Sequence, residues 1–150
     1  MDVIDYEIKK ASQKDLYLHL EMCDHLFVPL LSDKVNLHDY AQKIYKKSQT
    51  FEAWHDKKLV GLIAVYFNDS QSKKGYITNV SVLENYINKG IASQLIKMTK
   101  EYAKNNDFTK ISLEVHSKNK NAITLYKKQG FEIENKKEEA LFMEFRIKNN

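Results

Sequence analysis

The middle of the sequence switches twice between strand and helix patterns, and this order constrains the fold more than any other feature. Residues 76–83 alternate in polarity, and residues 91–103 place apolar side chains at helical spacing. A second strand pattern over 110–115 is followed by a helix pattern over 119–129, which Gly130 ends as a left-handed cap. Elements in this order predict a mixed α/β domain with a central sheet.

The flanking segments extend the same sheet. They predict a strand over 3–8, helices that begin at Ser12 and Asn36, a hairpin of strands over 50–54 and 59–67, and closing strands over 131–134 and 141–147. The expected order is β-α-α-β-β-β-α-β-α-β-β, a mixed, mostly antiparallel sheet flanked by helices. At 150 residues the chain is expected to form one domain over 1–150.

Charge composition narrows the class of partner. The net charge is +4, but the basic residues are 23 lysines and a single arginine, Arg146. Arginine is the side chain that forks onto guanine edges and phosphates, so its scarcity counts against DNA recognition. No apolar run approaches the roughly 20 residues of a membrane-spanning helix, and the N-terminus has no signal-peptide stretch. We expect no nucleic-acid partner, no membrane partner and a cytoplasmic protein, monomeric or homodimeric.

The cysteine and histidine content gives little support for metal or thiol chemistry. A single cysteine, Cys23, excludes an internal disulfide framework and a thiolate metal cluster. His19, Cys23 and His25 lie close in sequence, but they need a fourth ligand and a shared face, so an ordinary surface helix is the preferred interpretation. Cys23 is expected to be buried rather than nucleophilic. We therefore predict no metal site.

The turn before the helix over 91–103 has a pattern typical of anion binding. Gly90 stands where the helix begins, and a small residue there lets a diphosphate approach the backbone closely. The first N–H groups of a helix lack intrahelical partners and lie at its positive end. Lys89 adds a positive charge at the same point.

A second motif makes the pattern specific. Residues 119–131 read N-x-x-A-x-x-L-Y-x-x-x-G-F throughout, and Val80-x-Val82 precedes the glycine turn. With this turn, Ile87-Asn88-Lys89-Gly90-Ile91-Ala92, the chain resembles the GNAT superfamily, the acyl-CoA-dependent N-acetyltransferases, whose turn usually reads Q/R-x-x-G-x-G/A. Ile87 replaces the usual arginine or glutamine, which puts affinity in doubt more than the identity of the cofactor, because backbone amides carry most of the phosphate contact.

The resemblance implies the GNAT fold and acetyl-CoA as cofactor. Its pantetheine would pair with the strand that holds Val80, as an added strand would, and its diphosphate would lie on the amides of residues 87–93. Asn119 would bind the pantetheine arm, and the Tyr126 hydroxyl would point at the sulfur. The cofactor-binding residues that the resemblance implies are Val80, Ser81, Val82, Ile87, Asn88, Lys89, Gly90, Ile91, Ala92, Ser93, Asn119, Ala122 and Tyr126.

The implied reaction is direct attack of an amine on the thioester. An N–H group near Val80 would stabilise the oxyanion, and Tyr126 would protonate or hydrogen-bond the leaving thiolate, although core packing alone also accounts for a tyrosine at this position. The family often uses a carboxylate on the strand before the phosphate turn, and this strand has none. The candidates for the general base are Asp69, Glu84 and His116, or a relay of waters held by Asn79 and Tyr66.

The missing strand carboxylate favours a weakly basic acceptor. At about pH 7.5 an amine of pKa about 10.4 must lose a proton at a cost of roughly 4 kcal/mol, whereas an amine near about 7.8 needs only about 0.4 kcal/mol. An amino sugar or amino-sugar nucleotide is the first choice, a peptide or protein N-terminus the second, and a polyamine or antibiotic the third. A non-catalytic acyl-CoA sensor is the competing class. The candidate substrate-binding residues, which simple surface exposure also explains in part, are Phe27, Asp33, His38, Tyr66, Asn68 and Asn79.

Overall fold

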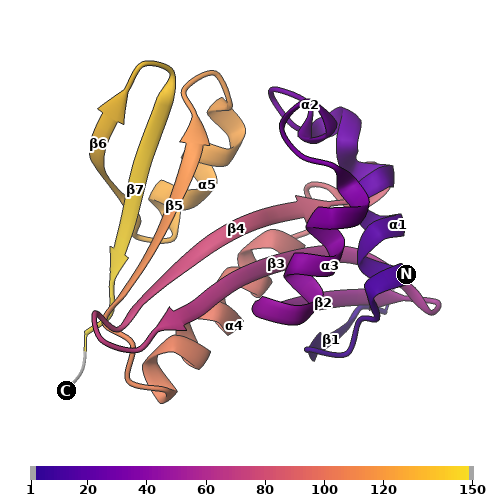
Figure 1. The fold of residues 1–150 in the computed structure, drawn as a ribbon, viewed down its shortest axis with the longest axis horizontal. Coiled ribbons are helices and arrows are strands. Elements are labelled where there is room, and N and C mark those ends of the chain that lie inside the picture. The colour runs from indigo at the N-terminus through magenta and orange to yellow at the C-terminus, as the bar shows by residue number, and fades with distance from the viewer. Residues whose placement is uncertain (1–2, 149–150) are drawn as a thin grey trace.

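The computed structural model describes residues 3–148 as a single twisted sheet with helices on both faces (Figure 1). Its elements are β1 (Asp5–Ile8), α1 (Gln13–Cys23), α2 (Leu31–Lys34), α3 (Leu37–Lys47), β2 (Gln49–His55), β3 (Lys58–Asp69), β4 (Lys74–Val82), α4 (Ile91–Asn105), β5 (Lys110–His116), α5 (Lys120–Lys128), β6 (Glu132–Lys137) and β7 (Ala140–Arg146). The strand order is β1-β2-β3-β4-β5-β7-β6, and only β4 and β5 run parallel. The predicted mixed, mostly antiparallel sheet is confirmed.

Local sequence signals fix several element ends as expected. Ser12 caps α1 in a reciprocal capping box with Asp15, and Asn36 caps α3. Asp56 and Lys57 take φ angles of 47° and 64°, as a tight hairpin turn between β2 and β3 requires. No described helix has the length and apolar character to cross a membrane.

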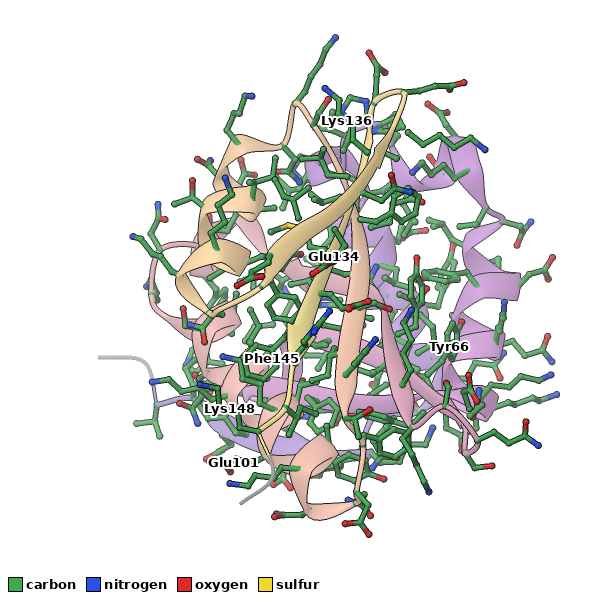
Figure 2. All side chains as sticks on the ribbon, turned by 90° about the vertical axis from the view of Figure 1, so that its left-hand side faces the viewer. Tyr66, Glu101, Glu134, Lys136, Phe145 and Lys148 are labelled. Carbon is green, nitrogen blue, oxygen red and sulfur yellow. The ribbon has the colours of Figure 1, made fainter. Side chains whose placement is uncertain are left out.

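The edge strand β6 is longer than its sequence suggests. The pattern predicts a strand over 131–134, but the strand continues to Lys137 and every residue in it is exposed. Figure 2 shows Glu134 and Lys136 on this outer strand. Pairing with β7, which the polar sequence of β6 does not reveal, extends the strand.

The sheet opens between β4 and β5, and this opening positions the site. The two strands pair only from Lys74 opposite Lys110 to Ile77 opposite Leu113. Directly after Ile77, the pairing of β4 with β3 skips Thr78, so Thr78 is a bulge. Beyond it the strands diverge, and Figure 1 shows β5, β7 and β6 rising away from β1–β4 with α5 beside them.

Gly61 on β3 allows α4 to pack closely against the sheet. A Cβ atom at this position would lie 2.7 Å from Ile91 Cγ2 and 3.2 Å from Ala53 Cβ, both in the buried core. We expect Gly61→Ala to lower the free energy of unfolding by about 1–3 kcal/mol, the usual cost of overpacking. Urea denaturation measures this loss of stability. An unchanged midpoint would show that α4 shifts away from the added methyl group without a cost in stability.

Candidate active site

A continuous groove follows the gap between β4 and β5. It consists of three adjoining cavities of about 270, 180 and 280 Å³. The first and second share Val80 and Tyr126, and the second and third share Val82 and Ala122. We call it the splayed-strand groove. It runs from the N-terminus of α4, through the gap, to an acceptor end beneath α2 and α3.

The main chain of β4 lies open along this groove. The N–H of Leu83 donates to the carbonyl of Val60 on β3 at 2.9 Å. Because an antiparallel strand bonds a given neighbour through every second residue, Ser81 also faces β3, whereas the N–H and C=O groups of Val80 and Val82 face the gap. No described hydrogen bond joins these groups to β5. An extended ligand can therefore pair with them as a strand would.

The N-terminus of α4 forms the other end of the groove. Gly90 adopts φ +79° as its N-cap, and a Cβ atom there would meet nothing within 4 Å. Of the side chains in residues 3–148, none caps this terminus, so the first N–H groups of α4 point into the third cavity without an intrahelical acceptor. Unpaired strand backbone leading to an open helix N-terminus fits the pantetheine and diphosphate of coenzyme A.

The helix α5 supplies two predicted residues to the groove. Asn119 Oδ1 accepts the N–H of Ala122 at 3.3 Å and caps α5, which leaves its amide nitrogen for a ligand. Tyr126 is only 7% exposed, yet it lines two of the cavities, and its ring centroid lies 5.9 Å from that of Phe131. Burial raises the pKa of Tyr126. Its hydroxyl therefore stays protonated over the neutral range and can donate a hydrogen bond, so its packing does not exclude a chemical role.

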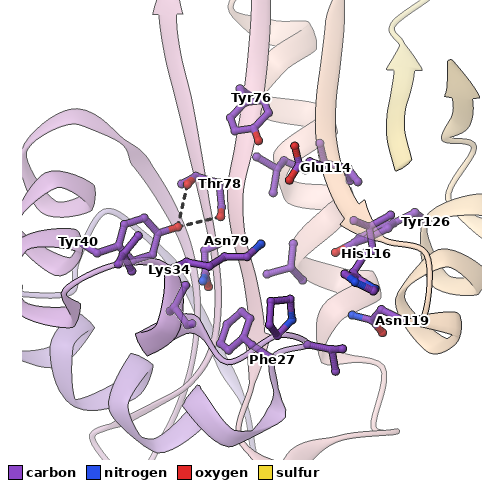
Figure 3. A pocket seen from close by; sticks show the side chains of 18 residues that line it. Phe27, Lys34, Tyr40, Tyr76, Thr78, Asn79, Glu114, His116, Asn119 and Tyr126 are labelled. Atoms are coloured by element: carbon purple, nitrogen blue, oxygen red, sulfur yellow. Dashed lines mark hydrogen bonds between the residues drawn. The ribbon is translucent and has the colours of Figure 1, made fainter. Parts of the chain in front are cut away.

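The acceptor end carries charges that sequence reasoning missed. Figure 3 shows Glu114 from β5 and Lys34 from α2 directed into this cavity, with Tyr76 close to Glu114. Glu114 is the one carboxylate among the described residues that line it. The alternation of β5 could have identified Glu114 from the sequence, because it places Glu114 on the same face as His116, one of the three candidate bases.

Tyrosines form the wall opposite Glu114. The Tyr40 hydroxyl donates to the carbonyl of Thr78 at 2.8 Å and lies 2.7 Å from its Oγ1, which ties α3 to the bulge. The pKa of Tyr76 is raised, first by burial and then by the negative charge of Glu114. Neither tyrosine was assigned to the site from the sequence, because both have ordinary core spacing.

The three candidate bases differ in placement. His116 lines the acceptor end, but its Nε2 donates to Glu139 at 3.0 Å and its Nδ1 accepts the N–H of Lys118 at 3.1 Å, which leaves no free lone pair. The Asp69 carboxylate accepts hydrogen bonds from Ser72, which lower the pKa of Asp69 and make it a weaker base. Glu84 is exposed beside His25, at 3.3 Å. Asp69 and Glu84 lie outside the splayed-strand groove.

The predicted substrate residues divide into three groups. Phe27 and Asn79 line the acceptor end. Tyr66 and Asn68 line a neighbouring cavity that also includes Asp69 and Tyr76. The remaining two lie in neither cavity: Asp33 is exposed on α2, and His38 stacks on Tyr17 with ring centroids 3.8 Å apart.

A buried polar chain supports the β4 side of the groove. His19 Nδ1 lies 2.9 Å from the carbonyl oxygen of Leu59, and its Nε2 lies 2.9 Å from the Ser81 hydroxyl. The Ser81 hydroxyl also contacts Asn79 Oδ1 at 2.7 Å. Burial raises the pKa of the neighbouring Cys23 thiol to about 12, so this thiol is not a nucleophile. Within residues 3–148 no group of metal-binding side chains is large enough to hold an ion.

His19 should make stability depend on pH. Burial lowers its pKa to about 4, whereas the unfolded chain binds the proton near about 6.5. The stabilisation is therefore complete above about pH 6.5 and is lost as pH falls toward about 4, by up to about 3 kcal/mol. Urea denaturation at several pH values should show this loss, and His19→Gln should flatten it. An equal pH dependence in both proteins would assign the loss to other groups.

Comparison with known proteins agrees with this geometry. The sequence model of the Acetyltransferase (GNAT) family matches residues 15–131. The N-alpha-acetyltransferase MAK3 of Arabidopsis thaliana is 31% identical over 115 residues, which are 75% of this chain and 60% of that protein. The chain therefore spans less than two thirds of this relative's length.

Solved structures share the fold. The ribosomal-protein-S18-alanine N-acetyltransferase from Escherichia coli superposes with a TM-score of 0.77 at 16% identity, covering 100% of this chain and 96% of that one. The PaiA N-acetyltransferase from Thermoplasma acidophilum, solved with coenzyme A, gives 0.73 at 19% identity, covering 95% and 99%. The family match covers most of the chain, and the fold agrees. The chain therefore belongs to the GNAT family of acetyltransferases.

Proposed function

We propose that this protein transfers the acetyl group of acetyl-CoA, the acyl donor of its family, to a weakly basic primary amine. The single observation that carries the proposal is the splayed-strand groove, which joins an uncapped helix N-terminus to unpaired strand backbone and then to a cavity holding both Tyr126 and Glu114. A binding site without reactive groups at its far end would favour a sensor instead.

Separate groups of the chain bind the donor and assist the reaction. The amides at the start of α4 and the backbone of Val80 and Val82 hold the donor, which supplies an activated thioester. The Val80 N–H faces the gap and can donate to oxygen charge that develops during attack. Tyr126 donates a hydrogen bond toward the leaving sulfur.

Glu114 is the base that we propose, acting on the amine directly or through water. It lies at the acceptor end, and it has no described hydrogen-bond or ion-pair partner to occupy its oxygens. His116 lacks a free lone pair, and Asp69 and Glu84 lie outside the groove. Glu114 therefore replaces these candidates in the proposal.

The acceptor class rests on amine basicity and on the relatives. An α-amine or an amino sugar loses its proton at a small free-energy cost near neutral pH, unlike a lysine side chain. MAK3 is named for α-amine acetylation and the bacterial structure for alanine of a ribosomal protein, so the peptide α-amine moves ahead of the amino sugar as first choice. We expect acetylation of one of these two classes.

An amine panel with detection of released CoA thiol tests the proposal. It should contain amidated peptides, amino sugars and a polyamine, each with acetyl-CoA. We expect thiol release with a peptide or amino sugar, at a higher kcat/KM than with the polyamine. Thermal stabilisation by acetyl-CoA without thiol release from any amine would instead favour the non-catalytic sensor.

A further inference from the structure

Two opposite charges face the acceptor end of the groove without pairing. The Glu114 carboxylate enters from β5, and the Lys34 ammonium reaches in from α2 (Figure 3). Among the described ion pairs and hydrogen bonds, none involves either side chain. The two charges also stay beyond ion-pair distance of each other, so a ligand can lie between them.

Two other polar side chains at this end, those of His116 and Tyr40, already have partners. His116 is held by Glu139 and Lys118, and the hydroxyl of Tyr40 is held by Thr78. Around Lys34 the wall is apolar and includes Leu31 and Val35. Lys34 is exposed, so its ammonium is available to an anion that enters the cavity.

We propose that the acceptor carries, besides its amine, an anionic group that Lys34 binds while Glu114 faces the amine. The anionic group is a carboxylate or a phosphate a few bonds from the amine. This inference rests on the proposed function and restricts its substrate class. An acceptor without an anionic group would leave the Lys34 charge without a partner. The preference for anionic over uncharged acceptors therefore follows from a single charge-assisted hydrogen bond.

Matched acceptor pairs test the inference. The first pair is the amidated tripeptides Ala-Asp-Ala and Ala-Asn-Ala, and the second is glucosamine 6-phosphate and glucosamine. Within each pair the amine is kept and the negative charge is removed. We expect the anionic member of one pair to show a kcat/KM about tenfold higher, which corresponds to about 1.4 kcal/mol. The pair that responds tells whether a carboxylate or a phosphate is bound.

Variants assign the preference to Lys34. Lys34→Met should raise KM for the anionic member more than for the neutral member and so abolish the preference, and Lys34→Glu should reverse it. Lys46→Met, which removes an exposed lysine of α3 outside the groove, serves as the matched control and should retain the preference.

The outcomes separate the inference from the proposed function. Equal kcat/KM values within both pairs, or an equal loss in both members with Lys34→Met, would overturn the inference while acetyl transfer stands. Acetylation of none of the four compounds would overturn it as well. Calorimetry with coenzyme A then decides whether the proposed function also falls, since an absence of binding removes its basis.

Discussion

Replacing Tyr126 by phenylalanine is expected to lower kcat about 100-fold, the usual loss when a positioned proton donor is removed. The affinity for coenzyme A should change little, because the ring that lines the groove is kept. Steady-state thiol release and calorimetry measure the two quantities. No described partner binds the Tyr126 hydroxyl, so Tyr126→Phe loses no internal hydrogen bond and the urea midpoint should stay nearly unchanged.

The raised pKa of Tyr126 favours hydrogen-bond donation over full proton transfer to the leaving thiolate. Complete proton transfer from a phenol above its ordinary pKa of about 10 to a thiolate of about 8.5 is unfavourable. Hydrogen-bond donation to the developing thiolate therefore accounts for its contribution better than full protonation does. Tyr102→Phe, on α4 away from the groove, is the matched control and should keep full activity. An unchanged kcat in Tyr126→Phe would reduce Tyr126 to a packing residue.

Replacing Glu114 by glutamine is expected to lower kcat/KM about 100-fold near neutral pH, since general bases contribute effects of this size. The loss should narrow as pH rises past the pKa of an α-amine, about 7.7–8.0, because the amine then arrives already deprotonated. A pH profile of kcat/KM for both proteins measures this convergence.

The matched control for Glu114→Gln is Glu132→Gln, an exposed carboxylate at the start of β6. It should leave the profile unchanged. A constant deficit at every pH would mean that Glu114 binds the acceptor without accepting its proton. If Glu114→Gln is as active as the native protein, water held by Asn79 and Tyr66 becomes the preferred base. These two residues carry the two buried side-chain atoms without a hydrogen-bond partner among the described residues.

The sequence predicted the fold well because its signals are local. Ser12, Asn36 and Gly130 act as caps through contacts within a few residues, and the structure confirms all three element ends. The strand β6 was predicted too short because its extension depends on pairing with β7, a contact that a polar sequence does not encode.

The candidate site was predictable on the donor side and less so on the acceptor side. The groove brings together Val80, Gly90 and Tyr126, which belong to the two motifs over 80–92 and 119–131. The acceptor end is built from α2, α3 and β5, which lie far apart in sequence. Lys34 and Glu114 line the same cavity because β5 diverges from β4 after the bulge at Thr78. The family resemblance implies that these two strands splay apart, but the spacing of residues does not show which side chains of α2 and β5 face the gap.

Amide hydrogen exchange with and without coenzyme A tests whether the splayed-strand groove holds the cofactor. We expect slower exchange at the amides of Val80, Val82 and residues 91–93 when coenzyme A is added, because these groups become hydrogen-bonded to the ligand. Strands β1 and β6 lie at the two edges of the sheet and should not respond. Unchanged exchange in the groove at saturating coenzyme A, or protection confined to another surface, would contradict binding of coenzyme A in the splayed-strand groove.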